Sequence, residues 1–254
     1  MGAAARVAGR LGGAAVLLLL AASPVVSARD ARAILDHVDD LFRGTSSHGE
    51  ASMRVVTEHW TRSLTLEFWT EGKDRSLIRI LAPKRERDTA TLKVENDLWN
   101  YLPKVKRVVK LPSSMLSASW MGSHVTNDDL VKESRMADDY TFEVTFDGAR
   151  DGTEVVEITC TPKPDAPVVW GRVVVEVRAG DLMPRRVRFY DEDLDLARTI
   201  TYDEVQTRGG RLLPTRLRVV PTDAPDEYTE ITWDEITFDV ALPADTFSLR
   251  RLQN

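Results

Sequence analysis

The sequence predicts a mainly β protein: a single large antiparallel curved sheet, an open half-barrel of about 11 strands, covered by an N-terminal helix and a short helical lid segment. Three observations predict this class. Apolar and polar residues alternate with period two through most of the chain after residue 50, which indicates strands with one buried face. Glycine-containing turns separate these runs. Helical spacing is confined to short segments that can cover the sheet.

The first 28 residues are predicted to be a secretory signal peptide. Arg6 and Arg10 precede an apolar run at residues 11–22, and small residues suited to cleavage end at Ala28. The apolar run is short for a membrane span, although an uncleaved anchor is the alternative. Cleavage leaves residues 29–254, which we expect to form one half-barrel domain that is soluble in the periplasm.

Residues 29–42 have the pattern of one amphipathic helix. Ile34 and Val38 recur at helical spacing on an apolar face. Asp30 lies near the start of the pattern, and Gly44 lies just past its end. Both are residue types that favour these positions at helix ends.

Strands with one apolar face follow the helix. Leu64, Leu66 and Phe68 share one side of the first clear example. The same alternation recurs at residues 141–146, 172–178, 186–190 and 216–219. In the last run, residues 228–238, the alternation slips near Asp234 and Glu235. The slip predicts a β-bulge there.

A different pattern interrupts the strands between residues 99 and 130. Pro103 breaks a strand, and Pro112 ends the next extended run. Large, soft side chains then stand among serines and alanines; they are Met115, Leu116, Trp120 and Met121. Methionine repacks readily around irregular shapes. We therefore expect this segment to be a mobile lid over an apolar cavity.

The same stretch carries a motif of aromatic, basic and small residues. Its members are Trp99, Tyr101, Leu102, Pro103, Lys106, Arg107, Val108, Ser119, Trp120, Met121, Gly122, Ser123, Asp129 and Leu130. The motif resembles that of the LolA-like family of outer-membrane lipoprotein-sorting proteins, and the resemblance extends over about residues 51–249. It departs from the family at His124, where an acidic residue is common.

The resemblance implies a carrier that takes acyl-bearing cargo from one membrane and delivers it to another, with an inner-membrane permease or transporter as partner. We expect the cargo to be a lipid or an acylated lipoprotein. The residues expected to line the cavity and lid are Leu66, Phe68, Trp99, Tyr101, Met115, Leu116, Trp120 and Met121.

A basic rim follows the same strand. Lys104, Lys106 and Arg107 stand out against an acidic chain. They fit contact with anionic lipid headgroups or with an acidic partner. Protection of an edge strand by cationic side chains explains them equally well.

The net charge argues against nucleic-acid binding. Of 34 basic and 40 acidic residues, loss of Arg6 and Arg10 leaves 32 and 40, a net charge of −8. Nucleic-acid binding depends on neutralising phosphates, so an acidic chain is a poor candidate. The lone cysteine, Cys160, shares the parity of apolar strand residues and is expected to be buried and inert.

No catalytic, metal or cofactor motif stands out, so we expect a non-enzymatic protein with no cofactor. The acidic cluster around Asp191 and Asp193 fits a solvated hairpin tip, with calcium binding or glycoside hydrolysis as alternatives. The leading interpretation is a periplasmic lipid or lipoprotein carrier. The main alternative is a non-enzymatic envelope assembly factor that partners a membrane transporter. A third interpretation is an enzyme that acts on envelope lipid or glycan, and it rests only on the acidic cluster and His124.

Overall fold

The computed structural model describes residues 1, 29–132, 139–164, 166 and 168–253. The predicted signal peptide falls almost wholly outside the described residues. No helix in the described ranges has the length and apolar character needed to cross a bilayer.

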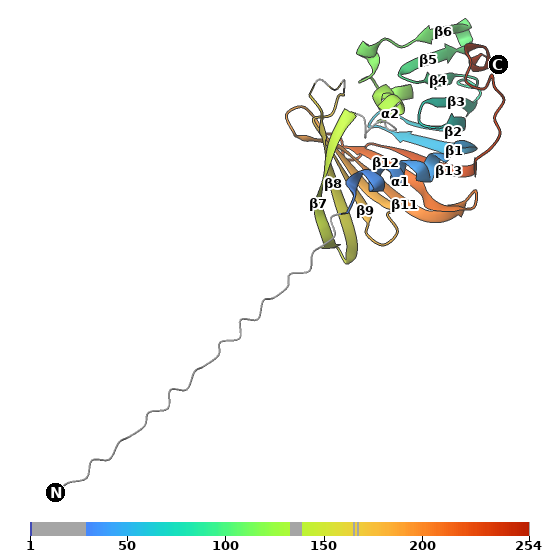
Figure 1. Cartoon of the computed structure of the whole chain (residues 1–254). Coiled ribbons are helices and arrows are strands. Elements are labelled where there is room, and N and C mark those ends of the chain that lie inside the picture. Colours follow the sequence, from blue (N-terminus) through green and yellow to red (C-terminus); the bar gives the residue numbers. More distant parts are fainter. Residues whose placement is uncertain (2–28, 133–138, 165, 167, 254) are drawn as a thin grey trace.

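In the described part of the chain, thirteen strands form one antiparallel sheet (Figure 1). They are β1 (Ser46–Val56), β2 (Thr61–Glu71), β3 (Arg75–Ala82), β4 (Ala90–Val94), β5 (Asp97–Leu102), β6 (Arg107–Lys110), β7 (Tyr140–Arg150), β8 (Thr153–Pro162), β9 (Arg172–Arg178), β10 (Pro184–Tyr190), β11 (Leu196–Arg208), β12 (Arg211–Pro221) and β13 (Tyr228–Phe238). The predicted class is confirmed, but the predicted strand number is too low. Strands as short as β4 and β6 contain too few residues for an alternating pattern to be recognised.

The strand order is β6-β5-β4-β3-β2-β1-β13-β12-β11-β10-β9-β8-β7. The first and last strands therefore pair in the middle of the sheet, and β6 and β7 are its two open edges. The predicted bulge is confirmed: Glu50 pairs with Glu235 and Ala51 with Trp233, so that Asp234 is the extra residue.

The helix α1 (Ala31–Arg43) begins and ends as the sequence predicts. The Asp30 carboxylate accepts hydrogen bonds from the backbone N–H groups of Arg32 and Ala33. Gly44, at a φ of 62°, ends the helix. The buried side of α1 carries Ile34, Leu35 and Leu41.

The helix and the lid cover the same face of the sheet. We define the lid as residues 113–132, which contain the short helices η2 (Ser113–Met115), η3 (Trp120–Gly122) and α2 (Asn127–Lys132). Ile34 and Leu35 of α1 pack on strands β7–β10, and Trp120 of the lid packs on β1–β3. Directly paired residues point to the same side of a sheet. A continuous row of such pairs links the cluster under α1 to the cluster under the lid; it runs through Val187, Ile200, Val219, Thr229 and Val55. We call this face the inner face and the opposite one the outer face.

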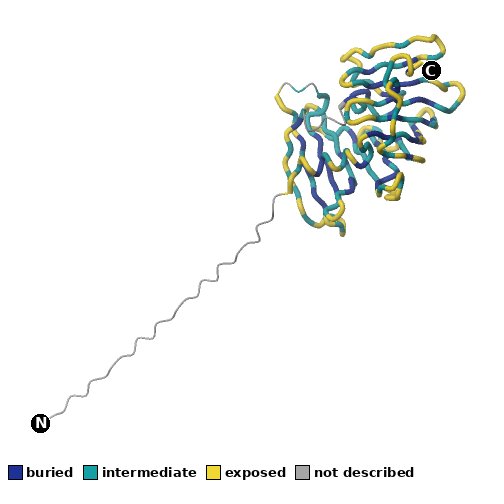
Figure 2. The backbone as a smooth tube through the Cα atoms, turned by 45° about the vertical axis from the view of Figure 1, so that its right-hand side comes forward, coloured by how far each residue is buried: buried dark blue, intermediate teal, exposed yellow. Residues whose placement is uncertain are grey.

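The chain's C-terminal segment covers part of the outer face. Leu242, Phe247 and Leu252, the last in helix α4 (Leu249–Leu252), join an apolar cluster on strands β2–β6. In the view of Figure 2, dark buried backbone follows the strands and the exposed positions concentrate at the turns. Strands β2 and β3 are thus buried on both faces, each face by a different part of the chain.

The close approach of β1 to β13 leaves room only for glycine at position 49. A Cβ at this position would lie 2.1 Å from the Glu235 carbonyl oxygen and 2.9 Å from the Cα of Ile236. Because backbone atoms cannot move aside cheaply, we expect Gly49→Ala to lower the free energy of unfolding by about 2–3 kcal/mol in denaturant titration.

Gly148→Ala is the matched control, since its nearest neighbour is a side-chain atom of Phe146 at 3.5 Å. It should change the free energy of unfolding by no more than about 0.5 kcal/mol. Equal effects from the two substitutions would contradict the packing described for β1 and β13.

Candidate functional site

The lid packs onto the inner face through Trp120. This side chain is only 2% exposed. It belongs to a cluster with Met53, Leu64, Leu66 and Ile80 of strands β1–β3. The indole is therefore the main apolar contact between the lid and the sheet.

A polar contact also orients the indole. Trp120 Nε1 donates a hydrogen bond to Thr91 Oγ1 at 3.1 Å. The Thr91 hydroxyl in turn donates to Asn100 Oδ1 at 2.8 Å. Since a buried indole N–H requires a partner, Thr91 and Asn100 fix the position of the ring on the sheet.

Arg198 holds the second half of the lid, through His124 and Asp129. This β11 residue is 4% exposed on the inner face. Its guanidinium is paired with the Asp129 carboxylate of α2 and donates to the His124 carbonyl oxygen at 2.9 Å. The same group lies against two rings, 4.6 Å from the centroid of Trp170 and 4.3 Å from that of Phe189. Arg198 thus joins the lid to an aromatic part of the sheet.

His124 attaches the lid to β13 and to the residue before it. Its backbone N–H donates to Thr229 Oγ1 at 2.9 Å. On the imidazole, Nδ1 lies 3.0 Å from the same oxygen, and Nε2 lies 3.1 Å from Glu227 Oε2. Hydrogen bonds from the Glu58 backbone N–H and from His124 hold the pKa of Glu227 below its ordinary value of 4.5. The resemblance leads one to expect an acidic residue at this position of the lid. The protein instead has a histidine, and its imidazole contacts the carboxylate of Glu227, directly before β13.

These contacts share one property: each is polar, whereas the main contact of the lid with the sheet, through Trp120, is apolar. Arg62 of β2 adds a further one by donating to the Met121 carbonyl oxygen. Water can replace the partner of each group when the lid moves away. The arrangement suits a cover that closes in a fixed position and can still be released.

The inner face remains apolar beyond the lid. Ile200 and Tyr202 of β11 pack with the α1 cluster, and Ile231 of β13 packs with the lid cluster; all three are only partly buried. Phe42 of α1 lies over the inner face with its ring centroid 4.8 Å from that of Trp233. The two covers therefore stand on one continuous apolar surface, which neither of them covers completely.

The predicted cavity and lid residues divide between the two faces. Leu66, Trp120 and Met121 come together on the inner face, and Phe68 shares their side of the sheet because it pairs with Ile78. Met115 and Leu116 belong to the lid, but Met115 is 48% exposed.

Trp99 and Tyr101 do not join this group. Trp99 pairs with Leu92, and both aromatic residues pack on the outer face below the C-terminal segment. The rim residues Lys104, Lys106 and Arg107 lie at the turn between β5 and β6 and are exposed.

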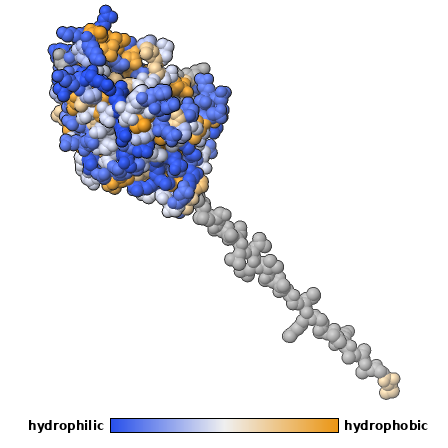
Figure 3. Space-filling model, turned by 180° about the vertical axis from the view of Figure 1, so that it is seen from behind, coloured by the Kyte–Doolittle hydropathy of each residue, from blue (hydrophilic) through white to orange (hydrophobic). Residues whose placement is uncertain are grey.

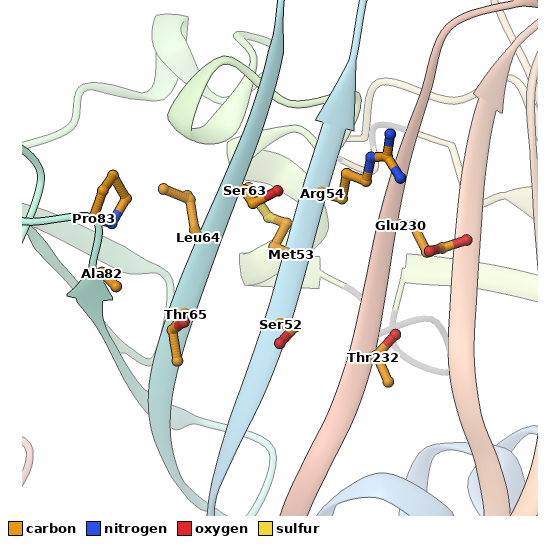
Figure 4. Close-up of a pocket in the computed structure, with 10 residues that line it drawn as sticks. All are labelled: Ser52, Met53, Arg54, Ser63, Leu64, Thr65, Ala82, Pro83, Glu230 and Thr232. Carbon is orange, nitrogen blue, oxygen red and sulfur yellow. The ribbon is translucent and has the colours of Figure 1, made fainter.

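Two hollows among the described residues open on the outer face. The larger, about 410 Å³, lies across β1, β2, β13 and the end of β3 (Figure 4). Its lining mixes hydroxyl groups and the charged Arg54 and Glu230 with the apolar residues Met53, Leu64, Ala82 and Pro83, and the lid lies behind the sheet in this view. A hollow with two charged side chains in its wall is a poor site for an acyl chain. The lid packs on the opposite, inner face, and the predicted apolar cavity stays a prediction.

Cys160 and the acidic cluster are found where the sequence places them. Cys160 is buried, and burial raises the pKa of its thiol to about 12. Asp191 accepts hydrogen bonds from the backbone N–H groups of Asp193 and Asp195 in the β10–β11 turn. Within the described ranges, no group of three or more His, Cys, Asp or Glu residues is placed to bind a metal ion.

Sequence reasoning missed the residues of the sheet that hold the lid, although a signal for them exists. Arg198 stands at an apolar-facing position, in step with Ile200 and Tyr202, and Arg62 is in step with Leu64. A polar residue at a core-facing position of a strand requires a buried partner. Only the structure shows that the partner is the lid.

Residues 72–254 match the model of a protein family whose description reads "-like: Uncharacterized protein". The chain belongs to this family. No curated protein matches the chain. Among solved structures, the fold is similar to that of a DUF1329 family protein from Desulfovibrio piger, with a TM-score of 0.78 and 23% identity over 87% of this chain and 96% of that one.

Two further structures carry names that match the predicted resemblance. A putative outer membrane lipoprotein-sorting protein domain from Vibrio parahaemolyticus has a TM-score of 0.76 and 20% identity, covering 87% of this chain and 97% of its own. A LolA superfamily protein from Nitrosomonas europaea has a TM-score of 0.75 and 21% identity, covering 88% and 100%. The predicted LolA-like fold is confirmed.

The Arg198 contacts predict a lid that loosens when they are removed. We expect Arg198→Met to leave Asp129 without its cation and to lower the free energy of unfolding by about 3 kcal/mol. Hydrogen exchange at the amides of Val125 and Leu130 should accelerate more than exchange in α1. Arg186→Met is the control, since this outer-face arginine makes no ion pair with a described residue. Unchanged exchange in the lid would contradict the role of Arg198.

The lowered pKa of Glu227 predicts a pH dependence. Because the folded-state pKa lies below the ordinary value of 4.5, ionised Glu227 stabilises the folded state above that pH. This contribution is lost as pH falls through the folded-state pKa. We therefore expect Glu227→Gln to destabilise the protein at neutral pH and to match the wild type in acid.

Denaturant titrations at neutral and acid pH measure this difference. Glu192→Gln, a change at an exposed turn residue, should show no such convergence. A Glu227→Gln difference that is the same at both pH values would show that the carboxylate charge is not what holds the contact.

Proposed function

We propose that this protein is a non-enzymatic periplasmic carrier that binds a lipid, or the acyl chains of a lipoprotein, on the inner face beneath the lid and moves it between membranes. The observation that carries this proposal is the continuous apolar inner face, part of which is closed by a segment held with polar contacts. The names of the solved structures with the same fold, which include a putative lipoprotein-sorting domain, support the same class.

The energetics of the lid suit this role. Exposing a tryptophan side chain of about 200 Å² costs about 5 kcal/mol. An acyl chain gains about 0.8 kcal/mol for each methylene removed from water. About six methylenes would therefore offset the displacement of Trp120 from the inner face. Ordinary membrane acyl chains are longer than this, so cargo can open a lid that stays closed without it.

The inner face also offers suitable surroundings for cargo. Displacing Trp120 uncovers Met53, Leu64, Leu66 and Ile80, which form a wide aliphatic floor. The partly buried Ile200 and Tyr202 extend this floor toward α1. A chain lying there would be removed from water over much of its length, as passage through an aqueous compartment requires.

A reversible crosslink between the lid and the sheet tests the proposal. His124 and Thr229 are in direct contact, with the backbone nitrogen of one 2.9 Å from the hydroxyl of the other. We expect His124→Cys with Thr229→Cys, in a Cys160→Ser background, to lose at least tenfold in uptake of a fluorescent fatty-acyl probe when oxidised. Reduction should restore uptake.

Thr145→Cys with Thr159→Cys is the matched control. These hydroxyls lie 3.0 Å apart on the outer face of β7 and β8, so their crosslink leaves the lid free and should not change uptake. Unaltered uptake in the oxidised lid variant would overturn the carrier proposal. In that case the alternative, an assembly factor that partners an inner-membrane transporter, would be favoured.

A further inference from the structure

The turn between β5 and β6 exposes an unusual amount of apolar surface. We call residues 102–115 the tip; they include the short helix η1 (Pro103–Val105). Leu102, Val105, Val109 and Met115 are 42%, 59%, 43% and 48% exposed. These are four of the ten large apolar residues that are exposed in the described part of the chain. Such clustering marks a surface that contacts something else.

The tip is also strongly basic. It contains Lys104, Lys106, Arg107 and Lys110 and no acidic residue, in a chain with a net charge of −6. Lys110 pairs with Asp97 at 2.6 Å. The other three make no ion pair with any described residue, whereas many other surface cations of this protein are paired. Their charge is therefore available to a partner.

The two features lie together in space. Leu102 pairs with Arg107 and Asn100 with Val109, so Leu102, Arg107 and Val109 are on one side of the β5–β6 hairpin. Figure 3 shows apolar and strongly polar residues side by side at the upper end of the molecule, the end that carries β5 and β6 in Figure 1. One short turn thus presents exposed apolar side chains and unpaired cations together.

The combination of cations and apolar side chains narrows the kind of partner that the tip can meet. Cationic protection of the edge strand β6 accounts for the lysines but not for the four exposed apolar residues. A protein partner fits less well, because lysine is depleted at protein interfaces, and two of the three unpaired cations are lysines. Apolar side chains surrounded by lysine and arginine are typical of segments that insert into the boundary of an anionic membrane.

We propose that the tip docks this protein onto membrane surfaces that contain anionic phospholipid, with Leu102, Val105, Val109 and Met115 entering the headgroup region and Lys104, Lys106 and Arg107 contacting phosphates. The tip also lies next to the lid in the chain. Met115 ends η2, and only four residues separate it from Trp120. A tip bound to a membrane therefore holds the lid close to the lipid surface.

Vesicle flotation tests the docking surface. The protein should bind vesicles of phosphatidylethanolamine with phosphatidylglycerol, bind weakly to phosphatidylcholine vesicles, and dissociate as salt is added. We expect the triple variant Lys104→Glu, Lys106→Glu, Arg107→Glu to lose about a hundredfold in affinity for anionic vesicles. Val105→Ser with Val109→Ser, which keeps the charge, should lose about tenfold.

The control variant carries the same change in net charge elsewhere: Arg32→Glu, Arg54→Glu and Arg186→Glu. It should bind within about twofold of the wild type. Wild-type binding by the tip variant, equal loss in tip and control variants, or full binding by the serine variant would overturn the proposal.

Uptake of the fatty-acyl probe in solution separates this result from the carrier proposal. The tip variant should take up the probe as the wild type does, because its substitutions lie outside the inner-face cluster. Failure of vesicle binding with normal uptake would overturn docking alone, and unaltered uptake in the oxidised lid variant would overturn the carrier proposal alone.

Discussion

An open sheet with one continuous apolar face is the constraint on which the rest of this molecule depends. The pairing of β1 with β13 in the middle of the sheet leaves β6 and β7 as distant edges that do not meet. The sheet cannot bury its apolar face by closing on itself, as a barrel does. Separate segments must cover that face, and the chain supplies α1 for one part and the lid for the other.

The two covers are held in different ways. The helix α1 packs mainly through aliphatic side chains such as Ile34 and Leu35. The lid adds to Trp120 a set of polar contacts, among them the largely buried ion pair between Arg198 and Asp129. An apolar replacement for such a pair is often neutral or stabilising, so stability alone does not account for it. Polar contacts fix one closed position and release into water, which is the property that a removable cover requires.

The sequence allowed the sheet, the helix with its caps and the bulge at Asp234 to be predicted, because each depends on local patterns. Alternation shows which residues of one strand share a face. It does not show how the faces of two strands correspond across an irregular connection. Trp99 and Trp120 belong to one motif, yet the chain reverses between them and they lie on opposite sides of the sheet. The partner of Arg198 is equally non-local, since 69 residues separate it from Asp129.

His124 attaches the lid to the sheet. The residue follows η3 and places its imidazole between Thr229 and Glu227, so the lid is attached close to the middle of the sheet, where β13 pairs with β1. The first residues of the lid, 113–115, are also the last residues of the tip. The contacts of His124 and Asp129 lie in the second half of the lid, so under the proposed docking the lid would pivot about them. Under the proposed carrier function, acyl chains would then enter from the side of β6 and reach the aliphatic floor of β1–β3 before they reach α1.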